Sequence, residues 1–320
     1  MFRHLKKELK IRDEPEFEII DVPEDPQKFY EDFGFLPHPR LRDQNGQPVL
    51  VKNLTPYQHE FWRYPGNALA IKSQKIGLTT SSLMEDFQYT ILPEGAGMDV
   101  LVIAQSQLLA NDHIRTLRNL IYNSGRYHQF LITSPDVFKD EKTKSSVIYV
   151  RNQYNKKRLS RIIGLGKSEL SVWSWKNVGK VHMSDVAKID LKEQKPFFGA
   201  VYSRLANTNG IIKIETPPNG QRGEIYNIYN KSRKGLDIDP TIADTFAEDP
   251  GDHASKFNMF EYPAKLAVEA GLITQEFLDQ ERHELGDSLF SQLYECNFLP
   301  PGNQWYDSSM IYTADYGVSY

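Results

Sequence analysis

Residues 68–80 read ALAIKSQKIGLTT, and this stretch decides the fold. Its first four residues form a short apolar run, which is typical of a buried strand. A polar turn with a single glycine, Gly77, follows, and a helical stretch is predicted from Ser81 to about Tyr89. A buried strand that leads through a tight turn into a helix is the repeating unit of parallel sheets. We therefore expect an α/β fold.

Segments on both sides of this stretch continue the alternation of strands and helices. The alternation predicts a mostly parallel sheet flanked by helices on both faces. The expected division is an extended arm with short helices over residues 1–50 that lies outside the core, a core domain over 51–235 and a smaller, mainly helical subdomain over 236–320. The expected strands are 98–104, 146–150, 161–164, 171–175, 180–183 and 210–214, and the expected helices are 56–63, 107–122 and 274–285.

Composition limits the class of protein. The chain has 320 residues and a formal net charge of -4, and 40% of its residues are hydrophobic. It lacks an apolar run of about 18 residues that could span a bilayer, and its charged first residues do not resemble a secretory signal. The single cysteine, Cys296, excludes an intrachain disulfide. A protein that binds DNA over its whole surface is expected to be more basic, so any DNA contact would be local, transient or shared between subunits.

The loop between the strand and the helix contains the parts of a phosphate-binding loop. Such a loop needs inward backbone N–H groups, a glycine where the backbone approaches phosphate, a cation, and a hydroxyl for magnesium. The usual order ends in Gly-Lys-Ser/Thr, but Leu78 stands in the lysine place here, which leaves Lys72 or Lys75 as the cation. By itself the loop could equally be an ordinary turn. The expected phosphate-binding residues are Lys72, Ser73, Gln74, Lys75, Ile76, Gly77, Leu78, Thr79 and Thr80.

Two later strands end in residues that suit the same chemistry. Residues 180–187 read KVHMSDVA, an apolar strand that ends at the carboxylate of Asp185. ATPases with a phosphate-binding loop place a magnesium ligand and a water-activating base in this way. Residues 211–226 read IIKIETPPNGQRGEIY, a strand that ends in Thr216-Pro217 before an Asn-Gly turn and an aromatic helix. Each segment alone is also compatible with a strand end that has no catalytic role.

In this order and spacing, the three segments resemble the ATPase domain of viral DNA-packaging terminase large subunits. The resemblance covers roughly residues 54–311. In many members of that family the lysine comes first in the loop, which implies that Lys72 is the cation, Gly77 the close approach and Thr79 the magnesium hydroxyl. The chain departs from the family at Gln74-Lys75, where Arg-Gln is usual. Lys75 is the residue that could take part of the arginine's role, although lysine lacks the bidentate fork.

The acidic strand can be aligned to the family pattern in two ways. Aligned on Ala187, Ser184 takes the place of the family's Asp, and Asp185 takes the place of the catalytic Glu. Aligned on the Asp instead, Asp185 is the metal ligand and Val186 stands in the place of the base, which cannot work. We prefer the first alignment, in which Ser184 binds a metal-bound water and Asp185 polarises the attacking water. The implied magnesium-site residues are Thr79, Ser184 and Asp185.

Three more residues or segments extend the resemblance. Thr216 takes the place of the hydroxyl in the family's coupling motif, where it can sense the γ-phosphate. Gln58, in LTPYQ, resembles the family's adenine-contacting glutamine, since an amide can donate to and accept from the adenine edge at once. Residues 290–298 resemble the segment that closes the family's ATPase domain, with Leu293 where Glu is usual.

The resemblance implies a mostly parallel P-loop NTPase sheet of the ASCE/RecA-like type, with a helical C-terminal lid. It implies an ATPase that uses ATP and Mg2+ to package double-stranded DNA into a procapsid, in the host cytoplasm at the portal. The implied partners are the portal protein, the small terminase subunit and further copies of the chain in a ring, with no membrane, although the chain alone could be a monomer. A neighbouring subunit would supply a basic finger, for which Lys176, Lys180 and Arg204 are candidates.

Two questions stay open at the level of sequence. The family's nuclease domain would begin after about residue 315, so we expect no nuclease activity from this chain, and residues up to 320 would start a linker to that absent domain. The changes at Gln74, Leu78 and Ser184 are also what a decayed, non-hydrolysing scaffold or nucleotide-binding protein would show. A helicase-like translocase is a weaker alternative, because it would need a second motor domain.

Overall fold

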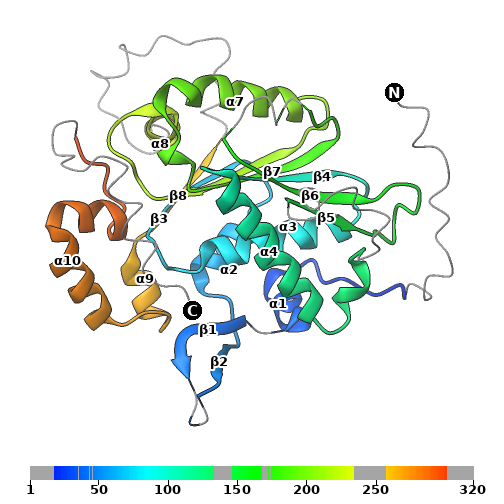
Figure 1. Ribbon diagram of the computed structural model, residues 1–320, viewed down its shortest axis with the longest axis horizontal. Coiled ribbons are helices and arrows are strands. Elements are labelled where there is room, and N and C mark those ends of the chain that lie inside the picture. Colours follow the sequence, from blue (N-terminus) through cyan, green and yellow to red (C-terminus); the bar gives the residue numbers. More distant parts are fainter. Residues whose placement is uncertain are drawn as a thin grey trace.

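The centre of the molecule is a seven-stranded sheet with strand order β5-β6-β4-β7-β8-β3-β9 (Figure 1). The computed structural model describes residues 18–34, 36–42, 44, 46–132, 146–167, 172, 174–233 and 257–300. Within the sheet, β5 pairs with β6 in antiparallel fashion and the other neighbours are parallel. The strands are β3 (Ala68–Lys72), β4 (Asp99–Ala104), β5 (Val147–Val150), β6 (Ser160–Leu165), β7 (Val178–Ser184), β8 (Ile211–Thr216) and β9 (Asn258–Tyr262).

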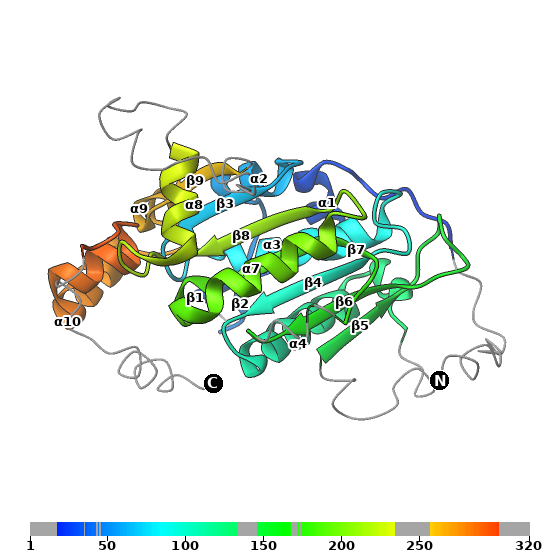
Figure 2. The same cartoon turned by 90° about the horizontal axis from the view of Figure 1, so that it is seen from above.

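Helices cover both faces of this sheet (Figures 1 and 2). One face packs against α3 (Leu78–Ile91) and α4 (Gln107–Asn123), and the opposite face packs against α7 (Leu191–Leu205) and α8 (Gly223–Arg233). Successive side chains of a strand point to opposite faces, so β4 needs apolar residues at consecutive positions. Val100 accordingly packs in the cluster under α3 and α4, whereas Leu101 packs in the cluster under α7. The predicted mostly parallel α/β fold is confirmed.

Most predicted elements have counterparts in the structure, and one predicted strand is wrong. Val172 is helical and Ser174 lies in a turn, while Ser171 and Trp173 lie outside the described residues. Trp175 does not pair in the sheet: its N–H donates to the Val172 carbonyl at 3.3 Å, which closes a turn, and its ring centroid lies 4.7 Å from the Arg161 guanidinium. Helix α7 and strand β9 were not predicted.

The N-terminal segment contributes to the core, contrary to the sequence-based expectation. Helix α1 (Pro26–Phe33) begins at Asp25, whose carboxylate accepts a hydrogen bond from the Lys28 N–H at 3.0 Å. Its Phe29, Tyr30 and Phe33 are buried in the same cluster as α3 and α4. Their spacing along the chain places these three rings on one side of the helix, which explains why the segment packs instead of staying extended.

The remaining elements flank the sheet. Strands β1 (Leu36–Arg42) and β2 (Pro48–Val51) form an antiparallel hairpin, α2 (Pro56–Arg63) precedes β3, and the 3-10 helix η1 (Tyr127–Phe130) follows α4. At one end of the sheet lie α9 (Ala264–Glu269) and α10 (Gln275–Tyr294), which extends the predicted helix 274–285 across a kink at Gly286 (Figure 2). Because β9 is an edge strand of the central sheet, the region after residue 235 also contributes to the core. None of the described helices is long and apolar enough to cross a membrane.

Candidate nucleotide-binding site

The predicted phosphate loop lies where the ends of three strands meet. Strand β8 lies between β3 and β7, so the carboxyl ends of these parallel strands share one edge of the sheet. Ligands of open α/β sheets bind at this edge. The loop runs from Ser73 to Gly77, and α3 begins at Leu78. The first N–H groups of α3 have no carbonyl partner within the helix and carry its partial positive charge, so this end of the helix suits an anion.

The loop needs glycine at position 77. Gly77 has a φ of 74°, in the left-handed region that favours glycine, and an added Cβ would lie 3.0 Å from the amide nitrogen of Gln58. The Tyr57 hydroxyl donates to the Ile76 carbonyl at 2.7 Å, and the Gln58 amide donates to the Gly77 carbonyl at 3.1 Å. Helix α2 therefore holds the backbone of the loop in place.

Gln58 is used within the fold in two ways. Its amide oxygen accepts from the Thr55 N–H at 2.9 Å, which completes the N-terminal capping box of α2, and its amide nitrogen holds Gly77. The side chain is buried. Contact between Gln58 and adenine stays a prediction, and it would require the amide to share or leave these partners.

The other end of the loop is tied to the lid. The Ser73 N–H donates to the Tyr262 carbonyl of β9, and the Gln74 N–H donates to the Leu293 carbonyl of α10. Lys75 has a φ of 60° and extends its ammonium group toward α10, where it lies 3.5 Å from a Glu281 carboxylate oxygen and 5.2 Å from the Phe277 ring centroid. In this conformation Lys75 contacts the lid, and Thr80 is half-buried on α3.

Lys72 lies at the centre of the site. Its ammonium nitrogen donates to the Thr79 hydroxyl at 3.0 Å and lies 2.6 Å from a Glu215 oxygen and 3.4 Å from an Asp185 oxygen. Burial by itself would lower the pKa of Lys72, but the two carboxylates outweigh burial and hold that pKa well above its usual range. The structure thus brings together a cation and a hydroxyl predicted from the loop segment and a carboxylate predicted from the acidic strand.

Glu215 was missed by sequence reasoning. It is fully buried at the position before Thr216, and its second carboxylate oxygen lies 3.4 Å from Nε2 of His182. Burial would raise the pKa of Glu215, but Lys72 and His182 lower it to about 2. The available signal was the alternation in IIKIET and KVHMS, where every second residue is polar although the strands are buried on both faces.

This alternation produces a buried charge network on the α3 face of the sheet. The Asp86 carboxylate on α3 lies 2.6 Å from Nδ1 of His182 and 2.9 Å from the Lys180 ammonium group. Glu85, its neighbour, lies 2.8 Å from Lys180 and 2.6 Å from Lys213. Buried charges are costly unless paired, so the network is expected to be sensitive to the loss of one member. Its members are Lys72, Glu85, Asp86, Lys180, His182, Lys213 and Glu215.

The far end of this network reaches helix α2. The Lys213 ammonium group donates to the carbonyl oxygens of Phe61 and Trp62 at 2.7 and 2.9 Å. Burial lowers the pKa of Lys213 to about 8, although Glu85 opposes the shift. The network therefore connects the helix that holds the loop to the lysine at the centre of the site.

The acidic strand ends in a turn that the coupling segment holds in place. Asp185 has a φ of 55°, which an Asp tolerates better than most residues, and the 3-10 helix η3 (Val186–Lys188) follows. The Ala187 N–H donates to the Thr216 hydroxyl at 3.2 Å, and the Asn219 amide donates to the Ala187 carbonyl at 2.8 Å. The Thr-Pro-Pro-Asn segment thus holds both the N–H and the carbonyl of Ala187, two residues after Asp185.

The oxygen atoms at these strand ends suit a hard cation. The Ser184 hydroxyl is fully buried and has no hydrogen-bond partner among the described residues. With the Thr79 hydroxyl and the Asp185 carboxylate it forms a set of oxygen donors, the ligand type that Mg2+ prefers. The described residues contain no group of three His, Cys, Asp or Glu side chains that could hold a metal by themselves.

His113 on α4 is a second residue that sequence reasoning missed. Burial lowers its pKa, and the charges of Glu215 and Asp185 oppose that shift. Its Nε2 atom is buried without a hydrogen-bond partner in the described part of the chain.

The structure also narrows the candidates for a basic finger. Lys180 is wrong for this role, because its side chain is 1% exposed and its ammonium group is paired with Glu85 and Asp86. Lys176 is exposed just before β7, at the opposite edge of the sheet from the loop, and the Arg204 guanidinium donates to the Trp175 carbonyl at 3.5 Å.

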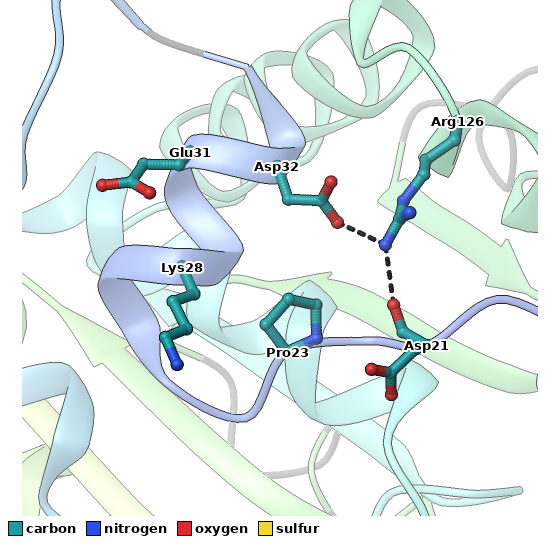
Figure 3. Close-up of a pocket in the computed structure, with 6 residues that line it drawn as sticks. All are labelled: Asp21, Pro23, Lys28, Glu31, Asp32 and Arg126. Carbon is teal, nitrogen blue, oxygen red and sulfur yellow. Dashed lines mark hydrogen bonds and ion pairs between the residues drawn. The ribbon is translucent and has the colours of Figure 1, made fainter.

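A surface hollow beside α1 lacks the loop residues and does not suit phosphate (Figure 3). Its Arg126 lies 2.5 Å from an Asp32 carboxylate oxygen and donates to the Asp21 carbonyl at 2.7 Å. Three carboxylates in the lining would repel an anion, and the arginine is already paired. The lining residues are Asp21, Pro23, Lys28, Glu31, Asp32 and Arg126.

Comparison with solved structures identifies the fold. The chain is similar to the ATPase domain of the Thermus phage P74-26 large terminase, with a TM-score of 0.58 and 14% identity over 85% of this chain and 98% of that chain. For the HK97 bacteriophage large terminase the values are 0.57 and 14%, over 88% and 55% of the chains. For the large terminase of a thermophilic bacteriophage they are 0.54 and 8%, over 77% and 53%. No protein-family model and no curated protein sequence matches the chain.

These similarities define the class of fold, which is a RecA-like sheet flanked by helices. The chain has the fold of the ATPase domain of phage large terminases. It spans about half the length of the HK97 terminase and of the thermophilic bacteriophage's terminase, at 55% and 53%. At sequence identities of 8 to 14%, the similarity establishes only the fold.

Proposed function

We propose that this chain is an ATP-hydrolysing motor domain of the large-terminase type. The observation that carries the proposal is the convergence of Lys72, Thr79 and Asp185 at the first turn of α3, within 3.0 and 3.4 Å of the lysine nitrogen. Lys72 and Thr79 come from the two ends of one loop, whereas Asp185 comes from the end of β7, more than one hundred residues later. A scaffold with a decayed site has no physical need to retain a buried cation, a hydroxyl and a carboxylate at the one edge of the sheet that suits phosphate.

In this proposal each residue has a distinct task. The loop N–H groups and Lys72 bind the phosphates, and Gly77 permits the backbone to approach them closely. Asp185 orients and polarises the attacking water, since its carboxylate faces the loop. Thr79, Ser184 and Asp185 would hold Mg2+, which neutralises charge on the phosphates when it is bound. Gln58 contacting the adenine edge is the remaining part of the nucleotide site.

The coupling of hydrolysis to movement would run through the segment after β8. Thr216 and Asn219 hold Ala187 behind Asp185, and the N–H of the next residue, Gly220, donates to the Gln292 side chain of α10 at 3.1 Å. A change at Asp185 on hydrolysis would therefore be transmitted to the lid along two short contacts. We propose that Thr216, whose hydroxyl accepts from the Ala187 N–H, senses the γ-phosphate through this turn.

The packaging role rests on the likeness of fold. We propose that the motor moves double-stranded DNA into a procapsid as a ring of copies at the portal, with a small terminase subunit, in the host cytoplasm. The net charge of -4 favours local or shared DNA contacts. The proposed division into an arm, an ATPase core to residue 235 and a lid subdomain needs two revisions. Helix α1 of the arm packs into the core, and β9 completes the sheet.

Calorimetry with Mg2+-ATP tests the proposal, together with a phosphate-release assay. We expect binding at or below millimolar nucleotide and slow turnover by the isolated chain, since neighbouring subunits are absent. Asp185→Asn should retain binding within about threefold but lose hydrolysis by a factor on the order of 100. Asp185→Glu should preserve or raise turnover if Asp185 is the base.

A matched control separates catalysis from stability. Asp112→Asn removes a carboxylate from the exposed face of α4, where it pairs with Arg115, and should change neither quantity. The absence of any nucleotide binding by the wild-type chain would establish the scaffold alternative instead.

A further inference from the structure

Ser184 and Glu215 occupy equivalent places on neighbouring strands. They are register partners in the parallel pair of β7 and β8, so their side chains point to the same face of the sheet, about 4.8 Å apart in backbone position. Both are fully buried at the edge where the phosphate loop lies. The two strands thus offer one neutral hydroxyl and one carboxylate to the same region of the site.

The contacts of Glu215 point toward the reacting groups. One carboxylate oxygen faces His182 at 3.4 Å, and the other lies 2.6 Å from the Lys72 ammonium group. Lys72 in turn donates to Thr79, the proposed magnesium hydroxyl. The Ser184 hydroxyl on the neighbouring strand has no hydrogen-bond partner in the described structure, so it could still bind a polar ligand here.

The charge requirement of the site favours a role for Glu215 beyond packing. A magnesium ion that bridges phosphates is usually held by one or two protein carboxylates as well. Ser184 supplies no charge, and Asp185 is a single carboxylate that the proposed function shares between the attacking water and the metal. Glu215 is the carboxylate that the neighbouring strand brings to the same place.

We propose that Glu215 is a positioning residue of the ATPase site that supplies, from β8, the negative charge that Ser184 does not supply from β7. Without nucleotide it holds Lys72 beside Thr79. With nucleotide bound, Lys72 would pair with the phosphates, and the Glu215 oxygen that now faces Lys72 would be free to help hold the metal. This inference rests on the proposed function and assigns to it a residue that the sequence resemblance did not.

The test compares ADP binding in Mg2+ and in EDTA, because a merely structural residue would affect both alike. For Glu215→Gln we expect the gain in ADP affinity on adding Mg2+ to fall by about tenfold, the effect of losing one charged hydrogen bond. Its affinity in EDTA should be unchanged or higher, since Lys72 is released for the phosphates. Asp86→Asn is the matched control, because it also removes a buried carboxylate from His182 but does not contact Lys72.

A double variant that moves the carboxylate from β8 to β7 provides a second test. Ser184→Asp combined with Glu215→Gln moves the carboxylate one strand across and keeps the net charge, so it should restore the wild-type gain from Mg2+. This variant decides the question even where Glu215→Gln alone fails to fold: a folded double variant without that gain overturns the inference.

The remaining outcomes separate the two levels of the proposal. Suppose that the wild-type chain binds ADP more tightly with Mg2+. If Glu215→Gln retains this gain, or if Asp86→Asn reduces it equally, only the role of Glu215 is overturned. A wild-type chain that binds no nucleotide overturns the proposed function and this inference with it.

Discussion

Protonation of His182 should make the stability of this domain fall as pH rises through neutrality. The ring is fully buried between two carboxylates, with Nδ1 2.6 Å from Asp86 and Nε2 3.4 Å from Glu215. Burial alone would lower the pKa of His182, but these carboxylates raise it from 6.5 to about 9. Between those two values the folded state holds a proton that the unfolded state has released, so the free energy of unfolding decreases with pH.

The size of the effect follows from the same values. The contribution of His182 is fully present below pH 6.5 and is lost as pH rises toward about 9. Between pH 6.5 and pH 8 the free energy of unfolding should therefore fall by about 1.5 kcal/mol. The window ends near pH 8 because Lys213, with its pKa lowered to about 8, then begins to lose its proton in the folded state. Above that pH, Lys213 adds stability and opposes the trend.

Urea unfolding followed by tryptophan fluorescence at intervals across this window measures the slope. His182→Gln can still donate to Asp86 but does not titrate, so its profile should be flat over the window. His128→Gln, at an exposed histidine in η1, is the matched control and should retain the wild-type slope. A flat wild-type profile, or an unchanged slope in His182→Gln, would refute the protonated state of His182 in the folded chain.

Three further substitutions test the loop, the coupling segment and the arm. Lys72→Ala should weaken Mg2+-ATP binding by about tenfold or more. Lys75→Ala should change it by less than about threefold, because Lys75 contacts Glu281 and Phe277 of the lid. Equal, negligible effects of both variants in calorimetry would refute the loop assignment. Asn219→Ala removes the donor to the Ala187 carbonyl and should cost about 1 kcal/mol of stability while lowering turnover more than nucleotide affinity, and steady-state kinetics that show the reverse would contradict the coupling role. Phe29→Ala should lower the free energy of unfolding by about 3–5 kcal/mol, and Leu50→Ala, at an exposed position, by less than about 0.5 kcal/mol; similar losses in urea unfolding would show that α1 is not part of the core.

Local patterns were sufficient to predict two central strands and the start of the helix before them. The apolar runs at 68–71 and 98–104 predicted strands β3 and β4, because a strand buried on both faces must be apolar at consecutive positions. The segment that reads Leu-Thr-Pro-Tyr-Gln predicted the start of α2, because a capping threonine and a following proline favour a helix N-terminus. These signals lie within a few residues of the structure that they specify.

Other elements were decided by contacts between distant parts of the chain. Strand β9 carries polar residues and lies nearly two hundred positions after its partner β3, so neither its pairing nor its place in the sheet is visible locally. Helix α1 becomes core because Phe29 meets Tyr127 and Trp62, with ring centroids 5.0 and 5.8 Å apart. Trp175, expected in a strand, instead contacts Arg161, which lies 14 positions earlier in the chain.

The sequence by itself determined the strand–loop–helix around Gly77 and the residue types at the ends of β7 and β8, because these depend on local backbone conformation and on the order of polar and apolar residues. Only the tertiary structure decided that β8 lies between β3 and β7, and this placement brings Glu215 to Lys72. A polar residue within an apolar strand is a local fact, whereas its partner is set by strand order. The charge of the buried residues, and with it the protonation of His182, depends on those partners and on the exclusion of water, which no stretch of sequence specifies alone.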